Sequence, residues 1–346
     1  MNTRYGFSTL SAALGILSLT LGLTLVSCGE KIESDAVARK MLSQKQIGIL
    51  DSFQSAALAK NTLKEKTRRT IHIIVPESYY TEAESRYPVV YFLHGFDESP
   101  DFLWKNRKYI AKLMADGTLP EMILVEPDCW TKLGGGFYAN SPVTGFYEDY
   151  LTRELVAFID ANFRTIPETA ARGLAGFSMG GFGALSQGLK HPDVYGAVFS
   201  LSPGVLAPDG LAVAMKDWAG DSKFLKAYAA VFSPAKRAVP KLDGSAADNA
   251  VCADWNSGFG DWDARIAAYQ AQPARLSALR IECGDSDKYR FIREGCAYID
   301  TALTAAGIEH QSAVFSGGHR LTLSKLADDI LPFMGANLAV KWSGDE

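Results

Sequence analysis

The stretch Gly-Phe-Ser-Met-Gly-Gly at residues 176–181 carries the strongest structural signal in this chain of 346 residues. Its G-x-S-x-G spacing is typical of a serine held on a sharp turn between a strand and a helix. A serine attacks a carbonyl group well only when its hydroxyl is exposed and a base can take its proton. The turn strains the backbone at Ser178, and Gly176 and Gly180 remove side chains that would collide there. The pattern therefore predicts that Ser178 is a nucleophile.

The segments that flank this motif fit the same interpretation. Residues 171–175 form a short run of mostly small and apolar side chains, which suits a buried strand. Residues 182–190 are compatible with a helix, which His191 and Pro192 would end. An ordinary glycine-rich turn is the alternative for the five-residue pattern alone, but the order strand, turn, helix favours a nucleophile.

The base that activates Ser178 is expected downstream, because the chain order in α/β-hydrolases is serine, acid, histidine. Of the five histidines, only His310 and His319 lie far enough along the chain to follow an acid. His310 begins the expected strand 311–315, where it reads as a surface residue. His319 lies in the loop that leaves this strand, so we predict that His319 is the base.

The acid is expected to follow the strand at residues 279–283. The sequence Gly-Asp-Ser-Asp at residues 284–287 offers both Asp285 and Asp287. Either aspartate could instead cap the helix that starts near Tyr289. The spacing alone leaves both candidates open.

An oxyanion hole needs two backbone N–H groups directed at the developing negative charge. One is expected from Met179, directly after the nucleophile. The other is expected from the loop after the apolar strand 88–93, where Gly95 allows a turn and leaves the Phe96 N–H as the donor. His94 lies upstream of the nucleophile, and we interpret it as structural.

Taken together, an ordered set of stretches resembles the esterase D family, whose members include feruloyl esterases, S-formylglutathione hydrolases, siderophore esterases and mycolyltransferases. The resemblance covers roughly residues 45–335. The matching stretches are residues 87–95, 119–123, 154–155, 159–160, 163–165, 175–181 and 201–204.

This resemblance implies site residues. The family's acid is the aspartate of a G-x-x-D pattern, which falls on Asp287; its histidine falls on His319, and its oxyanion donors on Phe96 and Met179. One departure is that Arg320 follows His319 where close relatives often carry aromatic residues.

Strand-like and helix-like segments alternate from about residue 88 to the end, which favours a single wound sheet. We predict an α/β-hydrolase fold over residues 46–340: a mostly parallel central sheet with antiparallel N-terminal strands and helices on both faces. The expected helices are 102–115, 147–162, 289–306 and 321–339, and the expected later strands are 195–201, 278–283 and 311–315.

Two regions fall outside this core pattern. Residues 128–147 contain three consecutive glycines followed by aromatic residues, which suggests a flexible flap whose Tyr138 and Asn140 contact substrate. Residues 205–275 form a lid-like insertion. We assign Trp218 in this insertion as a substrate contact, with packing as its alternative.

The N-terminus is interpreted as a lipoprotein signal peptide, residues 1–27. Residues 7–26 are apolar or small, and Leu-Val-Ser-Cys at residues 25–28 resembles a bacterial lipobox. Cys28 would then carry lipid, and residues 28–45 would form a tether. An uncleaved signal anchor is the alternative, since the apolar run is long enough to span a membrane. We expect a lipid-anchored protein of the bacterial cell envelope, and Gly29 favours an outer membrane.

The remaining composition narrows the class of partner. The net charge of −4 provides no basic patch, which argues against nucleic acid. No cysteine–histidine spacing indicates a metal, and we predict no cofactor. Exported proteins can oxidise their cysteines, so a Cys129–Cys252 disulfide is one candidate; Cys283 reads as a buried free thiol.

These observations predict a serine carboxylic-ester hydrolase that works through an acyl-enzyme and acts on a small-molecule or glycan-linked ester. One alternative is an acyltransferase, in which a sugar or lipid hydroxyl replaces water. Another is a non-catalytic surface binding protein, which the intact set Ser178, Asp287 and His319 disfavours. Feruloyl, acetyl, siderophore and simple acyl esters all remain open as substrates.

Overall fold

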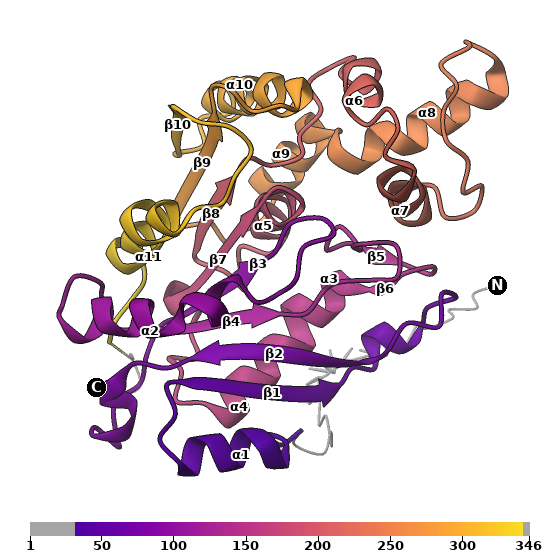
Figure 1. Cartoon of the computed structure of the whole chain (residues 1–346). Coiled ribbons are helices and arrows are strands. Elements are labelled where there is room, and N and C mark those ends of the chain that lie inside the picture. Colours follow the sequence, from indigo (N-terminus) through magenta and orange to yellow (C-terminus); the bar gives the residue numbers. More distant parts are fainter. Residues whose placement is uncertain (1–31, 342–346) are drawn as a thin grey trace, which may run out of the picture. The chain divides into compact units, whose positions relative to one another are not determined.

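A sheet of eight strands runs through the described part of the chain, residues 32–341 of this computed structural model (Figure 1). The order is β1-β2-β4-β3-β7-β8-β9-β10, and the pairs from β4 to β10 are parallel. The strands are β1 (Gly48–Gln54), β2 (Arg68–Ile74), β3 (Val89–Leu93), β4 (Ile123–Pro127), β7 (Arg172–Phe177), β8 (Ala197–Leu201), β9 (Ala278–Gly284) and β10 (Gln311–Phe315). A separate pair consists of β5 (Asn140–Ser141) and β6 (Gly145–Phe146).

The position of each strand in the sheet follows from its hydrophobic pattern. Every residue of β3, β7 and β8 is buried, as expected for parallel strands that are covered on both faces. Strands β1 and β2 alternate between buried and more exposed residues and pair antiparallel at one edge. The predicted fold class, with antiparallel strands at the N-terminal edge, is therefore confirmed.

Helices pack on both faces of the sheet and form two apolar layers. One face carries α2 and the C-terminal segment of η5 and α11, and the other carries α4, α5 and α10. Their bounds are α2 (Phe102–Ala115), α3 (Tyr147–Asp149), η3 (Tyr150–Leu155), α4 (Val156–Asn162), α5 (Met179–Lys190), α10 (Arg290–Ala305), η5 (Lys325–Ile330) and α11 (Leu331–Asn337). Short 3-10 turns are η1 (Ala57–Ala59), η2 (Glu77–Tyr80) and η4 (Thr169–Ala171).

The chain between β8 and β9 forms a helical insertion that lies beyond the end of the sheet in Figure 1. Its aromatic side chains, among them Trp218, Tyr228 and Phe259, pack against one another in edge-on and tilted contacts. The apolar side chains of the insertion therefore continue the core layer on the α5 face of the sheet. Its helices are α6 (Leu211–Asp217), α7 (Ser222–Phe232), α8 (Ala246–Phe259) and α9 (Trp262–Gln270).

The tether predicted for residues 28–45 is wrong over much of its length. Residues 36–43 form helix α1 (Ala36–Ser43), whose first turn is capped by the Asp35 carboxylate accepting the Ala38 N–H. Ala38 is completely buried, and the Leu50 N–H lies 3.3 Å from the Met41 sulfur. The helix is not evident from this charged sequence, because Ala38 and the stem of Met41 are enough to pack it on β1. The predicted signal peptide and Cys28 lie outside the described residues.

The predicted Cys129–Cys252 disulfide is also wrong, since both thiols are free. Cys129 is buried directly after β4, and its N–H donates to His94. Cys252 lies on α8, where its thiol faces Asp248. The two side chains therefore belong to different neighbourhoods. Cys283 is a buried free thiol, as predicted.

Residues 32–341 contain neither a helix able to cross a membrane nor a cluster of metal-ligating side chains. None of the helices in this range has both the length and the apolar character needed to cross a bilayer. Within the same range, His, Cys, Asp and Glu side chains form no group of three or more that could hold a metal ion.

Candidate active site

The strained turn predicted at the G-x-S-x-G motif lies between β7 and α5. Ser178 has φ 56° and ψ −113°, a conformation that residues other than glycine rarely adopt. A Cβ atom on Gly176 would lie 2.2 Å from the Gly180 oxygen, and one on Gly180 would lie 1.9 Å from the Leu93 oxygen. Both glycines are therefore required by close backbone contacts. The turn holds the Ser178 hydroxyl at the carboxyl end of β7.

Three side chains from distant parts of the sequence form one chain of hydrogen bonds. His319 Nδ1 lies 2.6 Å from Asp287 Oδ2, and His319 Nε2 lies 2.8 Å from Ser178 Oγ. A carboxylate can only accept, so Nδ1 carries the proton, and Nε2 of the neutral ring accepts from the serine hydroxyl. Asp287 is 2 % exposed, so its hydrogen bond with His319 is shielded from water. The arrangement has the order of acid, base and nucleophile that acyl transfer requires.

The two candidate aspartates have different partners. Asp287 reaches His319, and its second oxygen accepts the Tyr289 N–H at 2.9 Å. Asp285 instead accepts the Gly317 N–H at 3.0 Å, so it holds the backbone of the loop that carries His319. Spacing could not separate them, because both lie in the same turn after β9.

The alternative histidine lies elsewhere. His310 Nε2 lies 3.0 Å from Asp300 Oδ1, and its Nδ1 lies 2.9 Å from the Ile308 oxygen. Its partners lie on α10 and in the turn that precedes β10. His310 therefore stabilises a turn at the amino end of β10, while His319 lies beyond the carboxyl end.

The two predicted oxyanion donors flank Ser178. Met179 is the first residue of α5, so its N–H has no acceptor within the helix. The N–H of Phe96 donates to no acceptor within residues 32–341. Both residues also line the pocket that contains Ser178, so their assignment as oxyanion donors stays a prediction.

His94 sets the orientation of the Phe96 peptide. Its Nε2 accepts the Cys129 N–H at 3.1 Å, so the proton of the neutral ring is on Nδ1, which donates to the Gly95 oxygen at 2.8 Å. Burial lowers the pKa of His94 and keeps the ring neutral. Because C=O and N–H of a trans peptide point in opposite directions, this bond directs the Phe96 N–H away from His94.

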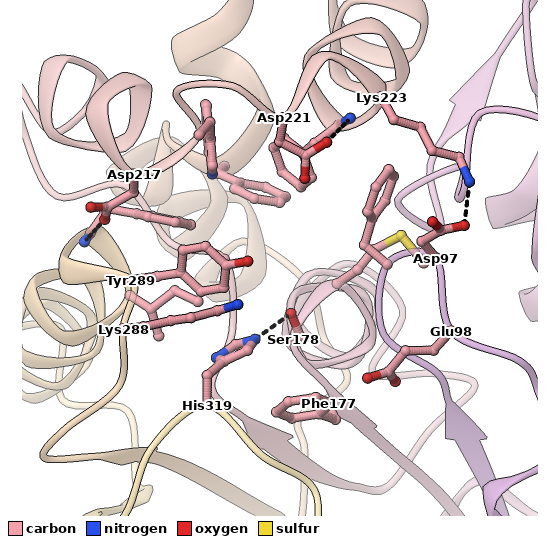
Figure 2. A pocket seen from close by; sticks show the side chains of 18 residues that line it. Asp97, Glu98, Phe177, Ser178, Asp217, Asp221, Lys223, Lys288, Tyr289 and His319 are labelled. Atoms are coloured by element: carbon pink, nitrogen blue, oxygen red, sulfur yellow. Dashed lines mark hydrogen bonds and ion pairs between the residues drawn. The ribbon is translucent and has the colours of Figure 1, made fainter.

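A pocket of about 350 Å³ opens above Ser178 (Figure 2). Its wall combines aromatic rings with charged side chains, among them Asp217, Asp221 and Lys288. The rings are those of Phe96, Phe177, Trp218, Phe224, Phe259, Tyr289 and Phe291. A second pocket of about 330 Å³ shares Glu98, Phe177 and His319 with the first and is also lined by Asp101, Lys105 and Arg320. Ser178 therefore faces the first pocket, here called the aromatic chamber for its rings, and the second pocket lies beside His319.

Of the three predicted substrate contacts, the pocket includes only Trp218. Tyr138 is 1 % exposed and donates its hydroxyl to the His94 oxygen at 2.7 Å, so its assignment as a substrate contact is wrong. Asn140 is exposed, away from the pocket, and accepts the Asp149 N–H. The predicted flexible flap is in fact a packed segment, because its glycines permit close contacts.

Several pocket residues were missed by the sequence argument. Glu98 lines both pockets, and its carboxylate accepts the Gly95 N–H at 3.0 Å. Desolvation raises the pKa of Glu98, and the Gly95 bond opposes this shift. Lys223 of α7 pairs with Asp97 across the mouth, as Figure 2 shows. The acidic pair directly after Phe96 is a local signal for Asp97 and Glu98, whereas Lys223 has none, because its partner is 126 residues away.

The sheet order, the strained serine turn and the hydrogen-bonded Ser178, His319 and Asp287 define an α/β-hydrolase. More specifically, the family described as "Putative esterase" matches residues 62–323, and the chain belongs to this family.

Two curated relatives match part of the chain. An esterase of Mycobacterium tuberculosis is 35% identical over 170 residues, which is 46% of this chain and 34% of that protein. An endo-1,4-β-xylanase/feruloyl esterase of Xylanibacter ruminicola is 31% identical over 153 residues, 41% of this chain and 20% of that protein. This chain thus matches only about a third or a fifth of the length of these relatives.

Solved structures of low sequence identity share the fold. A ferulic acid esterase superposes with a TM-score of 0.56 at 22% identity, covering 89% of this chain and all of that one. An S-formylglutathione hydrolase from Staphylococcus aureus gives a TM-score of 0.57 at 16% identity, covering 83% of this chain and 96% of that one.

Proposed function

We propose that this protein is a serine carboxylic-ester hydrolase that acts through an acyl-enzyme. The observation that carries the proposal is the continuous hydrogen-bonded path from Asp287 through His319 to Ser178. The names of the relatives support it, since they include esterases and feruloyl esterases.

Each residue of this path has a defined task in the proposed reaction. Ser178 Oγ attacks the ester carbonyl carbon while His319 Nε2 takes its proton. Asp287 holds the Nδ1–H tautomer and stabilises the imidazolium that forms. The Phe96 and Met179 N–H groups stabilise the negative oxygen of the tetrahedral intermediate.

The intermediate then collapses, and the bond to the alcohol breaks. His319 gives its proton to the departing alkoxide oxygen, which leaves an acyl group on Ser178. Water attacks this acyl group while His319 takes its proton; the bond to Ser178 Oγ then breaks, His319 returns the proton to Oγ, and the carboxylic acid leaves. We propose that the alcohol leaves and water enters through the second pocket, beside His319.

The aromatic chamber next to Ser178 suits the acyl group of the substrate. Its volume of about 350 Å³ is at the lower end of the range for small-molecule sites. We propose an ester with a small aromatic or aliphatic acyl group on a hydroxyl of a small molecule or a glycan. Lipid on Cys28 would place this activity in the bacterial cell envelope, a proposal that concerns residues outside the described range.

The decisive variant is Ser178→Ala. The alanine side chain fits the turn, so the fold is expected to persist, while ester turnover falls by about 10⁶-fold. Labelling of the protein by a fluorophosphonate probe, followed by mass spectrometry, is expected at Ser178 and absent in the variant. A variant that keeps more than about a thousandth of wild-type kcat contradicts the assignment of the nucleophile.

Product analysis in the same assay separates hydrolysis from acyl transfer. Hydrolysis releases free carboxylic acid in step with the alcohol. A new ester formed from an added sugar or lipid alcohol, with little free acid, would favour the acyltransferase alternative. Absence of both turnover and probe labelling in the wild-type protein would instead favour a binding protein.

A further inference from the structure

The segment of residues 129–138, here called the strap, runs beside the loop that supplies the Phe96 oxyanion donor. At its two ends the strap contacts His94. The Cys129 N–H donates to His94 Nε2 at 3.1 Å, and the Tyr138 hydroxyl donates to the His94 oxygen at 2.7 Å. The first of these bonds also fixes the tautomer through which His94 orients the Gly95–Phe96 peptide.

The middle of the strap contacts the other side of the same donor. The Gly134 oxygen accepts the Asp97 N–H at 2.9 Å, and Trp130 Nε1 donates to Asp97 Oδ1 at 3.1 Å. His94 and Asp97, which lie on either side of the Gly95–Phe96 pair, are therefore both bonded to the strap. The oxyanion loop is thus clamped along its length by a segment that contributes no atom to the catalytic chain.

Gly135 of the strap touches both oxyanion residues at one point. A Cβ atom there would lie 2.3 Å from Met179 Sδ and 3.3 Å from Phe96 Cδ2. Met179 is 2 % exposed but also lines the pocket above Ser178, so a methyl at position 135 would force the tip of its side chain to shift. A methyl group at position 135 would push against the side chains of both oxyanion donors. The absence of a side chain at Gly135 therefore allows the Phe96 and Met179 side chains to take their positions.

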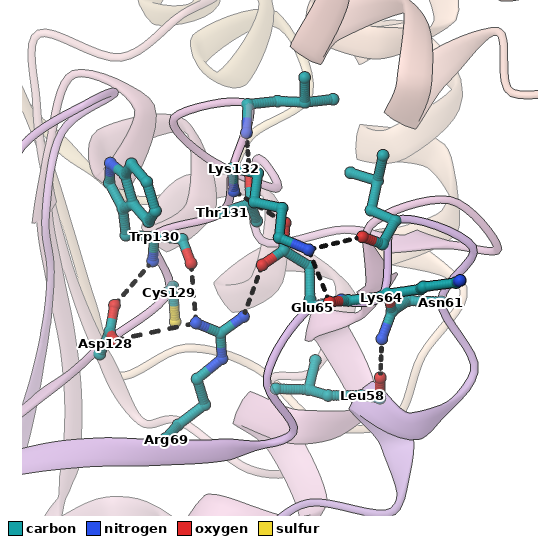
Figure 3. A network of polar contacts seen from close by, with 12 residues as sticks. Leu58, Asn61, Lys64, Glu65, Arg69, Asp128, Cys129, Trp130, Thr131 and Lys132 are labelled. Carbon is teal, nitrogen blue, oxygen red and sulfur yellow. Dashed lines mark hydrogen bonds and ion pairs between the residues drawn. The ribbon is translucent and has the colours of Figure 1, made fainter.

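The strap is itself anchored by a buried arginine (Figure 3). Arg69, which is 4 % exposed, donates to the Trp130 oxygen at 2.9 Å and to the Tyr147 hydroxyl at 2.7 Å. The neighbouring Glu65 accepts the Lys132 N–H at 2.7 Å. Strand β2 and the loop before it thus hold the strap at Trp130 and Lys132.

We infer that the strap positions the oxyanion hole, with Gly135 as the positioning residue that sets the seat of Phe96 and Met179. The inference rests on the proposed esterase function, because an oxyanion hole matters only if a tetrahedral intermediate forms. The strap acts on the transition state through the direction of two N–H groups, and it does not touch the ester.

The test compares Gly135→Ala with Gly136→Ala, its neighbour in the strap. A Cβ at Gly136 would lie 2.7 Å from the ring of the buried Tyr147, so it crowds the core without touching either oxyanion residue. Both variants are expected to unfold at a lower temperature. Gly135→Ala is expected to lower kcat by about 10- to 100-fold with little change in KM, since small misplacements of reacting groups can cost about 100-fold. Gly136→Ala is expected to lower kcat much less than Gly135→Ala, because its Cβ would meet the Tyr147 ring and neither oxyanion side chain.

A second measurement uses phenylboronic acid, which forms a tetrahedral adduct on a serine and places an oxygen in the oxyanion hole. Its inhibition constant is expected to rise in Gly135→Ala in parallel with the loss of kcat. The inhibition constant is expected to rise much less in Gly136→Ala than in Gly135→Ala. A purely structural role for Gly135 would change the melting temperature while leaving the inhibition constant unaffected.

A third measurement asks whether a second substitution restores the kcat of Gly135→Ala. Replacing Met179 by alanine keeps the backbone N–H and removes the sulfur that a methyl at position 135 would strike. The cost of Gly135→Ala in kcat is therefore expected to fall to under about threefold in the Met179→Ala background, as coupled neighbours behave in double-mutant cycles. An additive cycle, or equal loss of kcat in the two glycine variants, overturns the positioning role. A wild-type protein without turnover or fluorophosphonate labelling overturns the esterase function itself, which is a distinguishable result.

Discussion

At the scale of single residues, Ser178 holds an unfavourable backbone conformation that the surrounding structure imposes. Conformations of this kind cost about 1–3 kcal/mol each and persist only when neighbouring contacts over-determine them. The Ser178 N–H donates to the Leu201 oxygen of β8 at 2.9 Å, and its own oxygen accepts the Phe182 N–H of α5 at 2.9 Å. The serine is therefore fixed from the neighbouring strand and from its own helix. The strained backbone exposes the Ser178 hydroxyl, which would otherwise be covered by β7.

The two aspartates after β9 provide a prediction at this scale. Asp287→Asn is expected to lower kcat by about 10⁴-fold, because the amide stabilises the wrong tautomer of His319. Asp285→Asn is expected to cost much less, since its amide oxygen can still accept the Gly317 N–H. Steady-state kinetics of the two variants, with circular dichroism as the control for folding, decides the matter. If Asp285→Asn costs more than Asp287→Asn, the acid has been misassigned.

At the scale of elements, α2 begins at the end of the oxyanion loop and is capped from across the sheet. Its own preceding residue, Asp101, makes no capping hydrogen bond. Glu126, at the carboxyl end of β4, accepts the Phe102 N–H at 3.1 Å and the Leu103 N–H at 2.9 Å. A completely buried carboxylate on a strand thus does the work that a local side chain usually does for a helix N-terminus.

This capping carboxylate has a consequence for pH stability. Burial, only partly opposed by the N–H bonds to Leu103 and Phe102, raises the pKa of Glu126 from 4.5 to about 8. Because the folded pKa lies above the unfolded one, the stability that the protonated form contributes is complete below pH 4.5 and is lost as pH rises through about 8. Glu126→Gln removes this titration but keeps one acceptor oxygen.

We therefore expect the free energy of unfolding to depend on pH differently in the wild type and in Glu126→Gln. The free energy of unfolding of the wild type, measured by urea denaturation, is expected to fall relative to Glu126→Gln between pH 5 and pH 9, values chosen to bracket the shift to about 8. The comparison cancels every other titrating group that the two proteins share. A difference that stays constant across this pH range would mean that the pKa of Glu126 is not raised.

At the scale of the whole molecule, the site forms where the carboxyl ends of parallel strands meet. The strands β3, β7, β9 and β10 lead to the oxyanion loop, Ser178, Asp287 and His319, respectively. Ser178 and His319 are separated by 141 positions along the chain. Loops at the carboxyl edge of an open α/β sheet are the usual place for a ligand site, because successive strands release their loops on the same side.

The remaining prediction concerns attachment of the whole protein to a membrane. If Cys28 carries lipid, its acyl chains bury methylene groups worth about 0.8 kcal/mol each, and two or more chains anchor a protein stably. Mass spectrometry of the mature N-terminus is expected to find a diacylglyceryl-modified Cys28 peptide. An intact Met1 terminus, or a free terminus at another residue, would refute the lipobox interpretation. Fractionation of Cys28→Ser is a weaker test, because an uncleaved precursor could remain in the membrane through residues 7–26.

The local order of the chain was enough to predict the fold class and the bounds of several elements. The expected helix at 102–115 coincides with α2, and the expected strand at 311–315 coincides with β10. These predictions succeed because apolar periodicity and end signals are local properties. The helix expected over 321–339 is shorter, since η5 begins at Lys325. The role of Ser178 as a nucleophile could likewise be predicted from the local sequence, because the glycines that its turn requires are sequence neighbours.

Features that depend on the meeting of distant segments could not be read in this way. Asp285 and Asp287 were separated only by a family resemblance, and the structure separates them by which one reaches His319. The three glycines of residues 134–136 suggested mobility, yet each is a point of close packing against a side chain from elsewhere. A glycine reports only that a side chain is absent. Whether the freed space serves movement or close contact depends on which atoms the folded chain places opposite it.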